Sequence, residues 1–225
     1  DYNGLYCAVD ILKKENGGFA IYEVKSSTKY DKAVYAADVA YQKYVLEGCG
    51  INVIGTYLIC LNNQYVFDGV LNLDELFGIH DIADSVAVEE KNIAANLSIA
   101  ERILKSEKEP DIDLSVCCDR PYTCAFWSYC SRNLPKPSVF NLYRLHFDKK
   151  IEYYKEGLAD FKDLFYGADI TNAKQLRQML FAISDQGTYI DKDGIRDFLS
   201  TLSYPLYFLD FETIQPVIPQ FIGTK

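Results

Sequence analysis

Two short apolar runs on either side of an Asn-Gly step place the strongest constraint on how this chain folds. Residues 5–12 (LYCAVDIL) and 19–25 (FAIYEVK) are rich in apolar, β-branched and aromatic side chains. Asn16 and Gly17 lie between them, and both residue types tolerate the positive φ that a tight hairpin turn requires. The sequence therefore predicts two antiparallel strands joined by a short turn.

A helix and a further strand follow the hairpin. Over residues 31–47, apolar side chains recur at three- and four-residue spacing and Gly48 ends the pattern, which is typical of an amphipathic helix. Residues 51–61 have the composition of a buried strand, and a second short strand is expected at residues 65–67. The order strand, strand, helix, strand favours an α/β fold with a mixed sheet.

The rest of the chain is expected to be helical around one cysteine-rich loop. A long helix is predicted at residues 84–108, the loop at 117–130, and further helices at 138–202. Residues 206–214 (LYFLDFETI) are a strongly apolar strand candidate. We therefore divide the chain into a core at 1–69, a helical and cysteine-rich part at 70–137, a helical connector at 138–203 and the start of another domain at 204–225.

Composition and charge narrow the classes of function. Of the 225 residues, 49% are hydrophobic, which is ample for a packed core. No stretch approaches the length of an apolar membrane span, so we expect no membrane partner and a cytoplasmic protein. The 23 basic and 32 acidic residues give a net charge of −9, which argues against a nonspecific nucleic-acid coat protein. The charge is compatible with an enzyme that binds nucleic acid in a local groove through a divalent metal ion.

Three charged side chains gather on the predicted hairpin. Residues two apart on a strand share a face, so Glu23 and Lys25 project together, and Asp10 on the partner strand can reach the same place. The two carboxylates and the backbone carbonyl of Val24 form an oxygen-rich set suited to Mg²⁺ or Mn²⁺. Lys25 could orient or deprotonate an attacking water. The alternative is an ordinary hairpin whose charged side chains face solvent.

The predicted helix adds a polar side chain to this group. Asp38 and Gln42 lie four residues apart on one helix face, which can turn towards the strands. Gln42 is the stronger candidate because its amide could hold the water or Lys25 without adding charge. The candidate catalytic set is therefore Asp10, Glu23, Lys25 and Gln42.

These residues resemble a known nuclease superfamily. The strings AVDIL, YEVKSST and DVAYQKYVLEGCGINV are similar to the RecB-like branch of the PD-(D/E)XK nucleases, and more closely to uncharacterised bacterial proteins that join such a domain to a DnaQ-like exonuclease domain. The resemblance implies an incomplete restriction-endonuclease-like core whose first helix and strand lie upstream of Asp1. It also implies that Asp10 and Glu23 are metal ligands, Lys25 the catalytic lysine and Gln42 the supporting glutamine.

The cysteine-rich loop carries a second candidate metal centre. Seven cysteines, an odd number, favour thiol chemistry with a metal over a disulfide framework. Cys118, Cys124 and Cys130 are evenly spaced among aromatic residues, which suits a shielded iron-sulfur cluster or zinc, although both normally take four ligands. Resemblance to the iron-sulfur subset of RecB-like nucleases implies a 4Fe-4S cluster whose fourth cysteine lies upstream. Cys7 as the fourth ligand, Zn²⁺, and three free cysteines are the alternatives.

Two acidic residues near the end of the chain suggest another site. Asp210 and Glu212 are two apart on the predicted strand 206–214, so they would face the same way and could share a metal ion. The pair resembles the first motif of DnaQ-like exonucleases on an RNase H-like fold. The resemblance implies a second exonuclease site whose remaining aspartates lie beyond this sequence.

Together these features predict a metal-dependent deoxyribonuclease stabilised by an iron-sulfur cluster. Its partner would be nucleic acid, with DNA expected before RNA and single-stranded ends as the substrate by family analogy. The alternatives are a non-catalytic nucleic-acid-binding module that keeps the fold and a zinc-stabilised interaction protein. The intact set of Asp10, Glu23 and Lys25 favours the enzyme, because a binding module has no need of all three.

Overall fold

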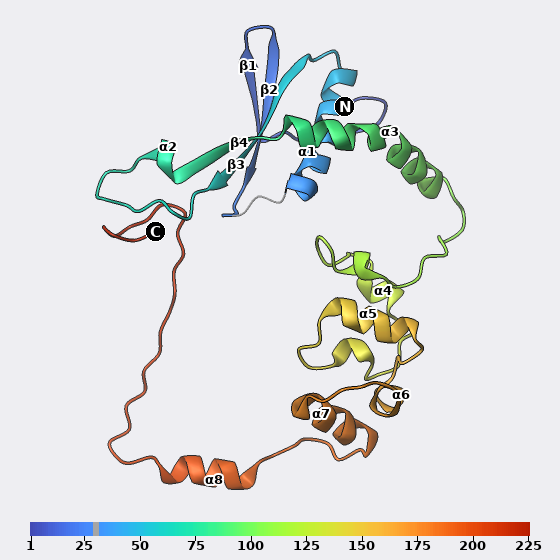
Figure 1. Cartoon of the computed structure of the whole chain (residues 1–225), viewed down its shortest axis with the longest axis vertical. Helices are drawn as coiled ribbons and strands as arrows, with labels where there is room; N and C mark the ends of the chain where they lie inside the picture. Colours follow the sequence, from blue (N-terminus) through green and yellow to red (C-terminus); the bar gives the residue numbers. More distant parts are fainter. Residues whose placement is uncertain (29–31) are drawn as a thin grey trace. The chain divides into compact units, whose positions relative to one another are not determined.

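The computed structural model describes residues 1–28 and 32–225 as an α/β protein (Figure 1). The chain divides into two compact units. The first comprises Asp1–Pro110 with Phe211–Lys225, and the second comprises Asp111–Asp210. Within the described residues, no helix is both long enough and apolar enough to cross a membrane.

The first unit is built on a four-stranded mixed sheet in the order β1-β2-β3-β4. Strands β1 (Ile11–Glu15) and β2 (Gly18–Lys25) form the predicted antiparallel hairpin, with Gly17 at φ +97° in the turn. Strand β3 (Val53–Leu61) runs parallel to β2, and β4 (Phe77–Asp81) pairs antiparallel to β3. Because β1 starts at Ile11, the stretch expected to be strand from residue 5 is largely outside it.

Helices pack on the sheet and complete the core of this unit. Helix α1 (Lys32–Gly48) connects β2 to the parallel strand β3, as a parallel crossover requires, and packs against α3 (Ala83–Leu104). Both helices match the predicted segments, although residue 31 lies outside the described residues and α3 ends before residue 108. The side chains buried between them and the sheet include Ile21, Val39, Leu58, Ile82 and Val86.

The prediction of a strand at residues 65–67 is wrong. Tyr65 is instead buried in an irregular loop, and its hydroxyl accepts a hydrogen bond from the Asn72 backbone. The chain then forms the short helix α2 (Leu73–Leu76) and enters β4, which the sequence analysis did not anticipate. The short run FGIHD has little alternation of its own, and its strand conformation depends on backbone pairing with β3.

The second unit is helical, as predicted for residues 138–202. Its elements are η1 (Val116–Cys118), α4 (Trp127–Cys130), η2 (Val139–Asn141), α5 (Phe147–Lys155), α6 (Phe161–Gly167), α7 (Ala173–Ile183) and α8 (Lys192–Ser200). Val139, Leu142, Phe161, Leu164 and Met179 form a separate hydrophobic core. Helices α6 and α7 pack against each other around it.

The strand predicted at residues 206–214 is not formed. These residues have no regular secondary structure, and apart from the half-buried Leu206 their large apolar side chains are exposed, with Phe208 at 93%. A strand needs a partner for its backbone groups, and the four-stranded sheet formed by the described residues does not include this segment. Further along, Thr224 and Gly223 instead form backbone hydrogen bonds with Phe67 of the first unit.

Candidate active site

A buried carboxylate on β2 is the centre of the candidate site. Alternation along β2 directs Ile21, Glu23 and Lys25 to the face that α1 covers, where Glu23 is only 6% exposed. Glu23 Oε1 accepts a hydrogen bond from Lys25 Nζ at 2.6 Å, and Oε2 accepts one from Gln42 Nε2 at 2.8 Å. Both carboxylate oxygens therefore have a donor, as a buried anion requires.

Lys25 is held between two carboxylates beside an aromatic ring. In addition to Glu23, its Nζ lies 3.4 Å from Asp38 Oδ2 and 5.1 Å from the ring centroid of Tyr35. Burial lowers the pKa of Lys25, but the hydrogen bond to Glu23 and the charges of Glu23 and Asp38 outweigh it and raise the pKa. In this arrangement Lys25 is an ammonium ion that donates hydrogen bonds, so the orienting role fits better than the role of a base.

Gln42 fills the gap between α1 and the sheet. It is 7% exposed, and its Nε2 donates to Glu23. Its Oε1 is buried, and the described residues offer it no hydrogen-bond donor. A buried acceptor without a donor is uncommon in folded proteins, and it marks a position where a water or a ligand can bind.

Asp10 reaches the same corner of the sheet from outside the strand. It lies just before β1, one step beyond the pair formed by Ile11 and Tyr22. Its Oδ2 accepts a 2.8 Å hydrogen bond from the backbone N–H of Val24, the residue between Glu23 and Lys25. The sequence pattern predicts Asp10 within a strand, but in the structure this side-chain contact positions it instead.

Glu23, Lys25 and Gln42 therefore belong to one network of side-chain contacts, and Asp38 joins it. Asp10 contacts the backbone of Val24 beside this network. Asp38, a weaker candidate than Gln42 from the sequence, lies one helical turn away and accepts a hydrogen bond from Lys25. Its spacing from Gln42 was the signal that could have included it, because residues four apart share a helix face. The side-chain network contains two carboxylates, one ammonium and one amide.

The donor set fits a hard divalent cation only in part. In the described parts of the chain, no group of three or more His, Cys, Asp or Glu side chains is placed to hold a metal ion. Magnesium, however, is often bound by one or two carboxylates together with waters and substrate phosphates. Asp10, Glu23 and the carbonyl of Val24 are the oxygens that could supply such a partial set, with Gln42 Oε1 as an unsatisfied acceptor nearby.

The cysteines of the loop lie in the second unit and are all free thiols. Cys118 ends η1 and Cys130 ends α4, while the backbone N–H of Cys124 donates to the Cys118 carbonyl at 2.9 Å. Cys7, the alternative fourth ligand, belongs to the first unit. Its thiol lies 3.9 Å from the Gln42 carbonyl oxygen, and burial raises its pKa.

The remaining candidate residues, Asp210 and Glu212, are exposed in the irregular segment near the end of the chain. The structure does not place them on a strand, so the shared face expected from their spacing is not formed.

Comparisons with protein-family profiles, curated proteins and solved structures found no match for this chain. The functional assignment therefore depends on the geometry around Glu23 and on the sequence resemblance.

Proposed function

We propose that this protein is a metal-dependent nuclease of the RecB-like PD-(D/E)XK type. The observation that carries the proposal is the buried Glu23, whose two oxygens are bound by Lys25 and Gln42. Burying a carboxylate on a sheet face costs free energy, and an apolar side chain would fill that place with a better core. A polar group retained at such a cost supports a functional role more strongly than a structural one.

The arrangement of elements supports the same proposal. A hairpin carries the carboxylates, α1 carries the glutamine, and β3 returns parallel to β2 beside them. The order strand, strand, helix, strand is the part of the nuclease core that the sequence resemblance implies for this region. The core between this sheet face and the two helices surrounds the buried Glu23 and Gln42.

The chain's own residues would divide the work of phosphodiester hydrolysis. Lys25, held as an ammonium, would donate a hydrogen bond to the attacking water or to a phosphate oxygen and stabilise negative charge there. Gln42 Oε1 would accept a hydrogen bond from that water and so orient it. Asp10, Glu23 and the Val24 carbonyl would hold Mg²⁺ or Mn²⁺. When bound, that ion would supply charge to stabilise the developing oxyanion.

A cleavage assay with matched variants tests the proposal. The chain is incubated with end-labelled single-stranded DNA in the presence of Mn²⁺, Mg²⁺ or EDTA. We expect cutting with either ion and none with EDTA, and we expect Glu23→Gln and Lys25→Ala to abolish it. Glu90→Gln is the control, because Glu90 is a partly buried carboxylate bound to Lys43 outside the site. Undiminished cutting by both site variants would refute the assignment.

We also propose that Cys118, Cys124 and Cys130 bind an iron-sulfur cluster with a structural role. Their even spacing in the sequence supports this, since such clusters are bound by several thiolates. Among the described residues, the three thiols are not yet grouped to hold a metal, and Cys130 is exposed. Protein purified without oxygen should be brown and contain iron and sulfide, and Cys124→Ser should lose both. Cys49→Ser is the control, because Cys49 is exposed in the first unit. Colourless protein with one zinc would favour the interaction module.

A further inference from the structure

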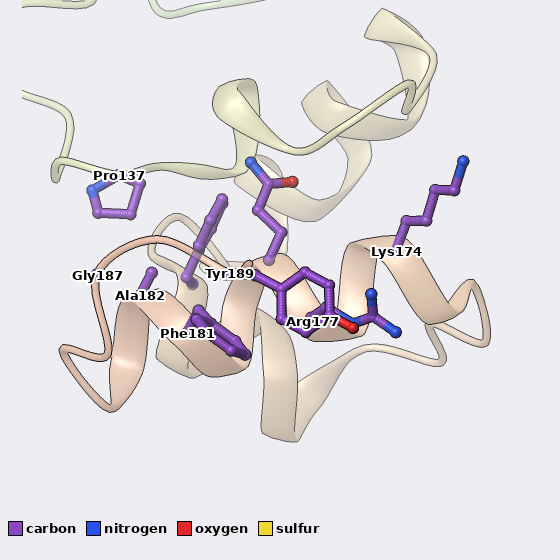
Figure 2. A pocket seen from close by; sticks show the side chains of 9 residues that line it. Pro137, Lys174, Arg177, Phe181, Ala182, Gly187 and Tyr189 are labelled. Atoms are coloured by element: carbon purple, nitrogen blue, oxygen red, sulfur yellow. The ribbon is translucent and has the colours of Figure 1, made fainter. Parts of the chain in front are cut away.

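A hollow of about 410 Å³ lies in the second unit beside α7. Phe161 lies at its buried side, and α7 contributes Lys174, Arg177 and Phe181. The chain beyond α7 turns back and adds Tyr189 (Figure 2). Its volume is within the range of small-ligand sites, about 300–1,000 Å³. None of these residues belongs to the site around Glu23.

One wall of the hollow is a stack of flat groups. The guanidinium carbon of Arg177 lies 4.1 Å from the centroid of the Tyr189 ring. Phe181 meets the same ring edge to face at 5.5 Å. Figure 2 shows Arg177 and Tyr189 lying together while Phe181 lies beside them. Because Tyr189 is 47% exposed, the stack presents flat surface to an incoming ring.

The same wall carries positive charge with no neutralising partner. Lys174 and Arg177 are one turn apart on α7, and no carboxylate lines the hollow. Within the residues that the structure describes, neither cation forms an ion pair with an acidic side chain. Arg196 of the same unit, by contrast, is paired with Asp193. Lys174 also lies over the Tyr143 ring, at 5.7 Å from its centroid. In a chain of net charge −9, two neighbouring cations without a carboxylate beside them fit an anionic ligand.

The hollow is held in shape by hydrogen bonds behind it. Gln178 Oε1 accepts from the Tyr143 backbone N–H at 2.8 Å, and its Nε2 donates to the Asn141 carbonyl at 2.8 Å. Gln175, which is buried, donates to the Tyr143 carbonyl at 2.8 Å. These bonds fix α7 to the end of η2 and to Tyr143 just after it. A ligand would therefore meet a preorganised wall, which reduces the entropy lost on binding.

We propose that this hollow binds one nucleotide of a single-stranded nucleic acid. A base would stack on the Arg177 and Tyr189 surface, and its phosphate would lie near Lys174. Flat aromatic or guanidinium surfaces beside cations are the combination that binds unpaired bases, whereas a duplex keeps its bases stacked and out of reach. The choice of a nucleic-acid strand rests on the proposed nuclease function. The hollow would be a separate contact that holds the substrate strand.

Binding measured without metal isolates this contact from cutting. The full chain is titrated into a short fluorescent oligothymidylate in EDTA, and anisotropy gives the affinity at several salt concentrations. We expect Tyr189→Ala to weaken binding by about tenfold, as loss of one base stack does. Arg177→Ala should also weaken binding, because the base loses part of its stacking surface. Lys174→Ala should reduce the slope of log affinity against log salt by about 0.7, because the phosphate contact is lost.

Two matched variants control for general effects of removing charge or an aromatic ring. Arg196→Ala removes an exposed arginine that is already paired, and Tyr166→Ala removes a tyrosine that is 76% exposed on α6. Both should bind the oligonucleotide as the parent does. Fluorescence of Trp127, the only tryptophan, reports whether each variant keeps the fold of the second unit.

The outcomes separate this inference from the proposed nuclease function. If folded Tyr189→Ala and Arg177→Ala bind as the parent does, or if a phosphotyrosine peptide binds the hollow more tightly than the oligonucleotide, the inference is wrong. If both variants lose affinity while the parent never cuts DNA, the hollow stands and the nuclease assignment fails. If the parent cuts DNA, Glu23→Gln binds normally in EDTA, and Tyr189→Ala and Arg177→Ala lose affinity, both proposals are supported.

Discussion

At the scale of single residues, the buried Glu23 carboxylate places the strictest requirement on its neighbours, because both of its oxygens need a hydrogen-bond donor. The carboxylate depends on Lys25 and Gln42 at once, so removal of either partner leaves an oxygen buried without a donor. The polar network is therefore a unit. Lys25 also forms an ion pair with Asp38, so the position of the Lys25 side chain on β2 is coupled to the face of α1 that carries Asp38.

Replacing Gln42 tests that dependence through stability. We expect Gln42→Leu to lower the free energy of unfolding by about 1–2 kcal/mol, because Glu23 Oε2 loses its donor while the unsatisfied Oε1 is also removed. Urea unfolding gives the value, with Gln64→Leu as the control because Gln64 is exposed. An unchanged midpoint would show that water replaces the amide.

A second residue-scale prediction concerns pH. Hydrogen bonds from Lys155 and Tyr154 lower the pKa of Asp113 in the folded protein. A lowered acid pKa stabilises the fold above the unfolded value of about 3.9, and this stability is lost as pH falls through the folded pKa. Asp113→Asn should therefore melt at a lower temperature than the parent near neutral pH. Because Asp113 is exposed, we expect the free energies of unfolding of the parent and Asp113→Asn to differ by less than about 1 kcal/mol.

The comparison of the two melting curves across pH is the decisive measurement. The gap between parent and Asp113→Asn should shrink steadily in acid, below about pH 4. A gap that stayed constant down to strong acid would mean that the charge of Asp113 is not its source. Asp111→Asn serves as the control, because Asp111 is a nearby exposed acid.

At the scale of elements, the hairpin turn determines how β1 and β2 present Asp10 and Glu23. Gly17 has φ +97°, a conformation that costs other residues about 1–2 kcal/mol. Gly17→Ala should lower the free energy of unfolding by about that amount, measured by urea unfolding. Lys14→Ala, an exposed change on β1, should have a much smaller effect. Equal losses in both variants would contradict a backbone origin.

Local patterns predicted the elements around the site because their information lies within each segment. The Asn-Gly turn, the helical periodicity that gave α1 and the apolar run of β3 are such patterns. Alternation on β2 also placed Glu23 and Lys25 on one face, and the helical repeat placed Gln42 towards them. This part of the candidate site was therefore predictable from sequence.

The elements that were missed depend on partners distant in sequence. Strand β4 exists through its pairing with β3, while the more apolar residues 206–214 form no strand because the described sheet does not pair with them. The hollow in the second unit was missed for a related reason. It requires Tyr189 to return to Arg177 across a loop that carries no periodic signal. Composition alone does not specify either kind of contact.

At the scale of the whole molecule, each unit has its own hydrophobic core. The core of the first includes Ile21 and Leu58, and that of the second includes Leu164 and Met179. Trp127 packs against Phe140 and Phe147 in the second unit, so its fluorescence reports on that unit alone. Separate cores imply that the two units contribute separately to stability.

Core truncations should therefore act on one unit at a time. Met179→Ala removes a fully buried side chain. It should lower the free energy of unfolding of the second unit, measured by Trp127 fluorescence in urea, by about 2–5 kcal/mol. Leu58→Ala should leave the fluorescence transition at the same urea concentration. In far-ultraviolet circular dichroism, only the part of the signal that comes from the first unit should unfold at lower urea. If Leu58→Ala moved both signals equally, the units would unfold as one cooperative body. Two separate shifts would mean that the Glu23 site and the hollow can each be destabilised without loss of the other.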